Sequence, residues 1–155
     1  LFPPEVGSQW QRFGDAVTSH ATVSFHNDGM VSPPIPLLNI QSAITRCTPS
    51  GTLHGPEQRI SLDDALRAHT VNAARHLRRD DLGSITPGSR ADLVELSSDP
   101  YEADPMRLTE QVSVLGTWRG GRRIDLDAFL EQVSAIDPVP HRDLAGHATH
   151  QRHCC

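Results

Sequence analysis

Hydrophobic and polar residues alternate along the chain between residues 21 and 28. Val23 and Phe25 fall on one side of this segment and His26 and Asp28 on the other, because successive side chains of a strand point to opposite faces. A glycine and a cluster of three prolines follow, and proline cannot continue a hydrogen-bonded ladder. The pattern predicts a strand that ends at the aspartate and leads into a loop.

The apolar positions then take a helical spacing in two regions. Over residues 36–44 they recur every three or four positions, and Pro36 suits the first position of a helix because no intrahelical partner exists there for an amide proton. The second region begins at Ser61, with Asp64 three residues later in a capping-box-like arrangement. We expect a pair of helices here, with a break near Thr70 and an end at a run of charged residues.

The other elements are shorter. Alternating positions predict strands over residues 91–96, 112–118 and 122–124, and the last two are separated by two glycines that favour a tight hairpin. Together they indicate a small antiparallel unit, followed by a terminal helix over residues 126–133. The first twenty residues show no clear period and predict a loop with a short helix over residues 9–13.

Composition narrows the class of protein. The chain has 155 residues and a net charge of -5, and all 14 of its basic residues are arginine. The absence of lysine excludes Schiff-base, P-loop and carboxylated-lysine chemistry within these residues. An acidic balance without a basic stripe argues against a nucleic-acid partner, and no apolar run suits a membrane span. Three cysteines, an odd number, favour a reducing, cytoplasmic location.

Asp28 and His26 are the candidates for chemistry. A carboxylate at the end of a strand, before a glycine and a proline-rich loop, occupies the position where parallel α/β barrels place catalytic groups. There it can bind a divalent metal or accept a proton. His26 lies on the same face and can contact a substrate. The structural alternatives are an aspartate that caps a turn and a histidine that is hydrogen-bonded inside a barrel.

Three other groups are weaker candidates. The tail over residues 137–155 contains histidines and two cysteines, but their spacing does not place three ligands on one helical face, so we expect a flexible tail. Arg46 can bind an anion or stabilise a helix C-terminus. Cys47 is expected to be a small buried hydrophobe, and the helix face with His69 and His76 to pack or face solvent.

Four segments carry a resemblance to a known family: HNDGMVSPPIPLLNIQSAITR, ISLDDALRAHTVNAARHL, LGSITPGSRADLVELSSDP and VLGTWRGGRRI. Over residues 21–124 the chain resembles the C-terminal part of the amidohydrolase superfamily, in particular the amidohydrolase-3 branch that includes N-substituted formamide deformylase-like enzymes. The resemblance implies an α/β fold: the C-terminal part of a (β/α)8 metal-dependent hydrolase barrel plus part of a small antiparallel β-sandwich domain. It divides the chain into barrel elements (1–82), a segment of the composite β-domain (83–125), and a terminal helix with a tail (126–155).

The resemblance also assigns roles to residues. Asp28 matches the aspartate that ends the eighth barrel strand, which in the family binds the metal and accepts the proton of the attacking water. The residue at the position of His26 varies in role in the family, so the resemblance adds little to His26 as a candidate substrate contact. Asp92 is implied to be structural, with a carboxylate that bonds turn amides of the β-domain. The implied cofactor is a divalent metal, zinc in most members.

Other features of the family are missing here. No His-x-His pair and no lysine occur in the sequence, and catalytic zinc ordinarily has three protein ligands. We therefore expect the remaining metal ligands to lie outside this chain, which reads as a fragment that is inactive alone. The expected function is hydrolysis of C–N bonds other than peptide bonds in small amide-type substrates. The alternative is a non-catalytic binding or assembly module, and self-association into a homo-oligomer is expected from unpaired edges.

Overall fold

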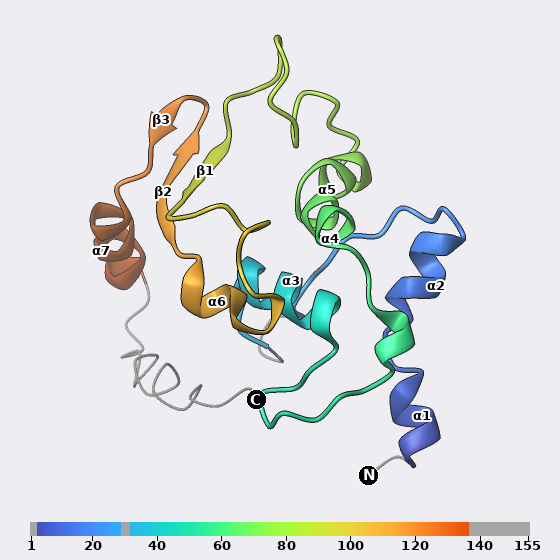
Figure 1. The fold of residues 1–155 in the computed structure, drawn as a ribbon. Coiled ribbons are helices and arrows are strands. Elements are labelled where there is room, and N and C mark those ends of the chain that lie inside the picture. Colours follow the sequence, from blue (N-terminus) through green and yellow to red (C-terminus); the bar gives the residue numbers. More distant parts are fainter. Residues whose placement is uncertain (1–2, 29–31, 137–155) are drawn as a thin grey trace.

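The computed structural model describes residues 3–28 and 32–136 (Figure 1). Its elements, in chain order, are α1 (Pro4–Ser8), α2 (Phe13–Thr18), α3 (Pro36–Thr45), the 3-10 helix η1 (Pro56–Gln58), α4 (Leu62–His69), α5 (Val71–His76), β1 (Leu93–Leu96), the 3-10 helix η2 (Pro105–Arg107), α6 (Leu108–Gln111), β2 (Val114–Arg119), β3 (Arg122–Arg123) and α7 (Leu126–Ile136). The fold is therefore mixed α/β, with the helices α1 to α5 preceding a small sheet.

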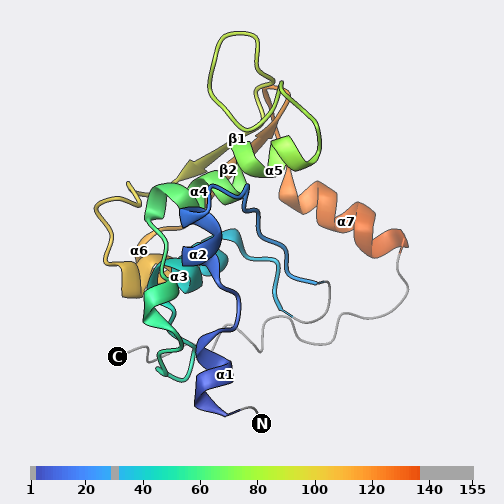
Figure 2. The ribbon, with the colours of Figure 1, turned by 90° about the vertical axis from the view of Figure 1, so that its right-hand side faces the viewer.

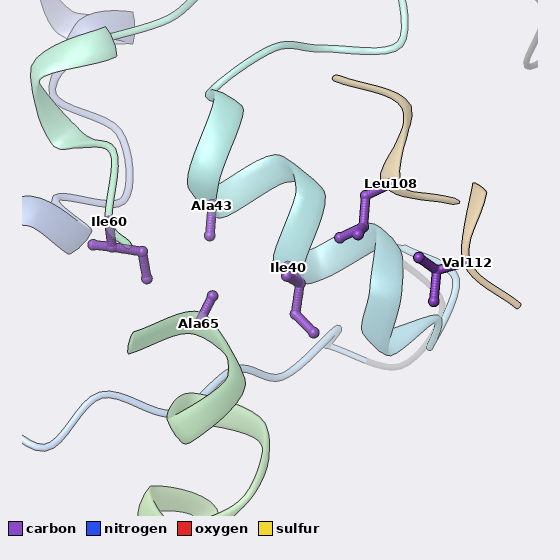
Figure 3. Packing of buried hydrophobic residues seen from close by; sticks show 6 residues of the cluster. All are labelled: Ile40, Ala43, Ile60, Ala65, Leu108 and Val112. Carbon is purple, nitrogen blue, oxygen red and sulfur yellow. The ribbon is translucent and has the colours of Figure 1, made fainter. Parts of the chain in front are cut away.

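The core lies around α3. Ala43 and Ala65 point towards each other between α3 and α4, and Leu108 approaches Ile40 from the opposite side (Figure 3). Ala43, Ala65 and Leu108 are at most 1% exposed, so little space separates these helices. Because small side chains allow helices to approach closely, α3 packs tightly against both α4 and α6.

The predicted helices are confirmed with their ends. Pro36 opens α3, and Ser61 caps α4 by accepting a hydrogen bond from the Asp64 amide at 3.1 Å. Thr70, with φ -118° and ψ -98°, separates α4 from α5 as expected. The loop predicted for the first twenty residues is wrong, since α1 and α2 lie there, and the short helix predicted over residues 9–13 is wrong because these residues mostly connect the two. The helical turns η1, η2 and α6 are also absent from the prediction.

The antiparallel unit is also confirmed. The sheet has the order β1-β2-β3, with Leu93 opposite Trp118 and Arg119 opposite Arg122. The two glycines between β2 and β3 have φ values of 58° and 78°. Positive φ at both central residues is what a two-residue type I′ turn requires. In Figure 2, α7 leads away from the end of this sheet.

The strand predicted over residues 21–28 is wrong for the described part of the chain. Residues 21–27 carry no ladder and Asp28 is in a turn. A strand exists only where a second strand supplies hydrogen-bond partners, and residues 21–27 pair with none of the described strands, which form the β1-β2-β3 sheet. Neither a barrel nor a sandwich is visible in these ranges. The described helices include none that is long and apolar enough to cross a membrane.

Candidate functional site

The segment over residues 21–28 is held by helices instead of a sheet. Asn72 Nδ2 donates to the Val23 carbonyl at 3.0 Å, and Ser24 Oγ lies 2.7 Å from His76 Nδ1. Both helical partners belong to α5. The expectation that His76 packs or faces solvent is confirmed, because the residue is exposed, and its ring also bonds the segment.

Phe25 anchors the middle of this segment. Its ring meets Phe13 at 5.2 Å between centroids and His69 at 5.1 Å, both edge to face. His69 therefore packs, as predicted. Its Nε2 is buried without a hydrogen-bond partner among the described residues, and burial lowers the pKa of His69.

Asp28 stands at the end of the segment with an open carboxylate. The side chain is exposed, and within the described residues the carboxylate makes no hydrogen bond or ion pair. Its backbone has φ 52°, in the left-handed region that most side chains avoid. The Asp28 amide donates to His26 Nδ1 at 3.2 Å. An exposed, unpaired carboxylate in this conformation is free to bind a cation or take a proton.

Asn27, the residue before Asp28, is held by several side-chain hydrogen bonds. Its Nδ2 donates to Ser32 Oγ at 3.0 Å, to the Pro33 carbonyl at 2.8 Å and to Asn39 Oδ1 at 3.0 Å. Asn39 Nδ2 donates back to Asn27 Oδ1 at 3.0 Å. The two amides form a reciprocal pair that ties the end of the segment to α3, and Ser32 Oγ also donates to the Asn27 carbonyl at 3.1 Å.

His26 is exposed and lines a hollow beside Asn27. The hollow has a volume of about 440 Å³, and its lining includes Phe25, Pro33 and Asn39. Apolar and amide groups together suit a small molecule with a polar head. The imidazole of His26 thus lies where it can contact a ligand, while its Nδ1 is engaged by the Asp28 amide.

A complete metal site is absent from the described residues. No group of three or more His, Cys, Asp or Glu side chains within residues 3–28 and 32–136 is arranged to hold an ion. Asp28 fits the role of one ligand among several, since an unpaired carboxylate oxygen is a suitable donor for a divalent cation. The histidines and cysteines of the tail lie outside the described residues.

Asp92 has the structural role expected of it. Its Oδ1 accepts from the Gly120 amide at 2.6 Å, in the turn between β2 and β3, and lies 3.0 Å from Arg90 Nε. The carboxylate therefore joins the start of β1 to the hairpin turn. This leaves it bound within the sheet region, on a different part of the chain from Asp28.

Arg46 stabilises the fold rather than presenting an anion site. As the residue after α3, it has φ 58° and donates to the carbonyls of Trp10 (2.6 Å), Gln11 (3.3 Å) and His54 (3.0 Å). Burial lowers the pKa of its guanidinium. The neighbouring Cys47 is half-buried, so the expectation of full burial is wrong.

Sequence reasoning missed the asparagines. Asn27, Asn39 and Asn72 provide hydrogen bonds that hold the segment beside the one between Ser24 and His76, and none of the three was predicted as a candidate from the sequence. A signal existed for one of them: an asparagine directly before a candidate catalytic aspartate and a proline-rich loop has a side chain that commonly bonds nearby backbone groups. The other two become visible only when the helices pack on the segment.

Comparison with known protein families gives one match that covers most of the chain. The family model described as "Amidohydrolase family" matches residues 4–125. The match begins closer to the N-terminus than the resemblance over residues 21–124, so it takes in α1 and α2 as well. No solved structure matches the chain at a significant level.

Curated relatives match shorter stretches. Protein LONG AFTER FAR-RED 3 of Arabidopsis thaliana is 36% identical over 72% of this chain and 19% of its own length. An imidazolonepropionase of Picrophilus torridus is 34% identical over 58% of this chain and 19% of its own length. An N-substituted formamide deformylase of Arthrobacter pascens is 36% identical over 52% of this chain and 15% of its own length. The chain spans less than a fifth of the length of each of these relatives.

Proposed function

From the premise that this chain belongs to the amidohydrolase family, we propose that it is the C-terminal part of a metal-dependent hydrolase acting on C–N bonds other than peptide bonds. Asp28 is its catalytic carboxylate. In this proposal residues 1–82 complete a (β/α)8 barrel, residues 83–125 belong to a composite β-domain, and residues 126–155 form the terminal helix and tail.

The observation that carries the proposal is the state of the Asp28 carboxylate. It is exposed and unpaired within the described residues, although the segment before it is held by hydrogen bonds and ring contacts. Asp92 provides the contrast, because its carboxylate accepts from the Gly120 amide and pairs with Arg90. Within residues 3–28 and 32–136 the Asp28 carboxylate has neither kind of partner, so in this proposal its acceptor atoms serve the reaction.

The proposed chemistry divides between this chain and the rest of the protein. A bound divalent metal, zinc in this proposal, supplies activation of water, because it lowers the pKa of a coordinated water. Asp28 would provide one ligand to that ion, and the remaining ligands come from outside this chain. As a general base, the Asp28 carboxylate accepts a proton and returns it to the leaving nitrogen.

The substrate class follows from the relatives and the hollow. One relative is named an N-substituted formamide deformylase and another an imidazolonepropionase, which favours a small amide-type molecule. His26 is placed in this proposal as a substrate contact, because it lines the hollow of about 440 Å³ and its side chain is exposed.

The odd number of cysteines supports a cytoplasmic location in this proposal.

The test is Asp28→Asn in the full-length protein, with metal content and hydrolysis of simple N-formyl and N-acyl amides as readouts. We expect kcat to fall about 100-fold or more, since losing a general base typically costs that much. Asp92→Asn is the matched control, because it removes the same charge from a carboxylate bound within the sheet region. The control should lose stability and keep kcat.

Two results would overturn the proposal. One is a full-length protein that binds no divalent metal and hydrolyses no amide. The other is an Asp28→Asn variant with unchanged turnover and metal content. The first result favours a binding or assembly module that has kept the family's fold without its chemistry, and the second removes Asp28 from the catalytic role.

A further inference from the structure

The pair of Asn27 and Asn39 is the most connected polar group near Asp28. The Asn27 amide nitrogen has three acceptors within 3.0 Å, whereas an amide group has only two protons to donate. One of the two protons is therefore shared between two acceptors. The Asn39 amide closes the pair by donating to Asn27 Oδ1 at 3.0 Å. Both side chains are half-buried, so these bonds face limited competition from water.

This network fixes the backbone on both sides of the site. Asn27 precedes Asp28 directly, and Ser32 and Pro33 lie beyond it in the chain. The Asp28 backbone has φ 52°. A residue other than glycine keeps a left-handed conformation where contacts with the surrounding structure hold it there. The bonds of Asn27 supply that constraint, because a rotation at Asp28 would pull the Asn27 side chain away from α3.

We propose that the reciprocal amide pair of Asn27 and Asn39 positions the Asp28 carboxylate for metal binding and proton transfer. This inference rests on the proposed function of Asp28. Asn39 does not contact the reacting atoms and acts through Asn27, so it is a positioning residue. Its place early in α3 gives it a firm base, because α3 packs in the core through Ile40 and Ala43.

The chain offers a matched control for a purely structural role. Asn72 also reaches the segment from a helix, and it donates to the Val23 carbonyl at 3.0 Å. Its bond holds the far end of the segment and does not involve Asn27 or Asp28. If asparagines serve only to hold the segment, Asn39→Leu and Asn72→Leu should behave alike.

The experiment compares Asn39→Leu, Asn39→Asp and Asn72→Leu in the full-length protein. Three quantities are measured: the melting temperature, the affinity for Zn²⁺ after removal of metal with a chelator, and kcat with KM for an N-formyl amide. We expect Asn39→Leu to lose about 10- to 100-fold in Zn²⁺ affinity and in kcat, the range typical of residues that orient metal ligands. KM is measured as well because Asn39 also lines the hollow, and a change in KM alone would indicate a substrate contact instead of a positioning role.

The other two variants define the mechanism. Asn39→Asp keeps the acceptor for Asn27 Nδ2 and loses the donor to Asn27 Oδ1, so its Zn²⁺ affinity and kcat should lie between those of the wild type and Asn39→Leu. Asn72→Leu should lower the melting temperature and leave Zn²⁺ affinity and kcat at wild-type values. If Asn39→Leu does not fold, a clear loss of Zn²⁺ affinity in folded Asn39→Asp carries the same conclusion.

The outcomes separate this inference from the proposed function. If Asp28→Asn leaves metal content and turnover unchanged, the proposed function fails and the inference fails with it. If Asp28→Asn lowers both but folded Asn39→Leu and Asn39→Asp keep wild-type Zn²⁺ affinity and kcat, only the inference is overturned. Equal losses in Asn39→Leu and Asn72→Leu also overturn it, since they indicate a general effect of loosening the segment.

Discussion

His69 places an imidazole where water reaches it poorly. Its ring packs edge to face on Phe25, and its Nε2 is buried without a partner among the described residues. Burial removes water from the ring, and within the described residues no acceptor faces Nε2, so the charged form of the ring is disfavoured. Burial therefore lowers the pKa of His69 in the folded chain below its ordinary value of 6.5, and folding depends on pH through this residue.

The first prediction concerns that dependence. Because the pKa of His69 is lowered in the folded state, the unfolded chain binds the proton more readily. The stability linked to neutral His69 is fully present above the ordinary value of 6.5 and is lost as the pH falls below it. We expect the melting temperature to drop between pH 7.5 and pH 5.5 by an amount that His69→Leu reduces. His76→Gln, in the next helix, should leave the drop largely in place. An unchanged drop in His69→Leu would contradict the prediction.

For the candidate site, the sequence predicted the properties of single residues better than it predicted the contacts between them. The sequence indicated that Asp28 and His26 share one face, and both side chains are exposed. It also indicated that Asp92 bonds a turn amide, which the contact with Gly120 confirms. Asn39 could not be found, because its bond to Asn27 joins residues that only the packing of α3 brings together. Single-residue chemistry is readable from sequence, whereas a pair depends on tertiary contacts.

At the scale of elements, local rules succeeded where each element supplies its own hydrogen bonds. A helix satisfies its backbone internally, so Pro36, Ser61 and the break at Thr70 could be read from the sequence. A strand needs a second strand. For that reason the alternation over residues 21–28 correctly separated Phe25, which packs, from His26, which is exposed, but could not establish a ladder. The hairpin of β2 and β3 was predictable because only two residues separate the two strands that pair.

The second prediction tests the contact that holds the break between α4 and α5. Gly83 has φ 83°, and a Cβ at this position would lie 2.8 Å from the Thr70 carbonyl oxygen. Gly83→Ala therefore adds a backbone clash to the strain of positive φ. Gly88, with φ 93° and no atom within 4 Å of its Cβ position, carries the strain alone. We expect Gly88→Ala to cost about 1 kcal/mol and Gly83→Ala roughly 2–4 kcal/mol.

Thermal unfolding of the two variants measures the difference. For a chain of this size, about 1 kcal/mol corresponds to roughly 2–4 °C in melting temperature. The Gly83→Ala variant should therefore melt several degrees below Gly88→Ala. Equal melting temperatures would show that the loop before β1 can move away from Thr70 without cost, and the close approach would then have no role in fixing the helix break.

On the scale of the whole molecule, the described residues leave much apolar surface uncovered. Val94 and Leu115 of the sheet are 56% and 52% exposed, and Phe129 and Leu130 of α7 are 53% and 57% exposed. The buried core around α3 is small by comparison. Proteins that act as monomers rarely expose so many large apolar side chains close together in the chain. The chain spans less than a fifth of the length of its relatives, and in the proposed enzyme these surfaces are covered by the remainder of the protein.

The last prediction follows from that exposed surface: the 155-residue chain self-associates when it is produced alone. Sedimentation velocity over a range of concentrations should show species larger than a monomer. Leu130→Arg should weaken association about tenfold, equivalent to about 1.4 kcal/mol, because it puts a charge on the apolar side of α7. Gln132→Arg adds the same charge to the same helix at a position that is already polar and exposed, so it should have little effect. A monomer with a sharp, cooperative thermal transition would contradict the prediction, and equal weakening by both variants would assign the effect to net charge.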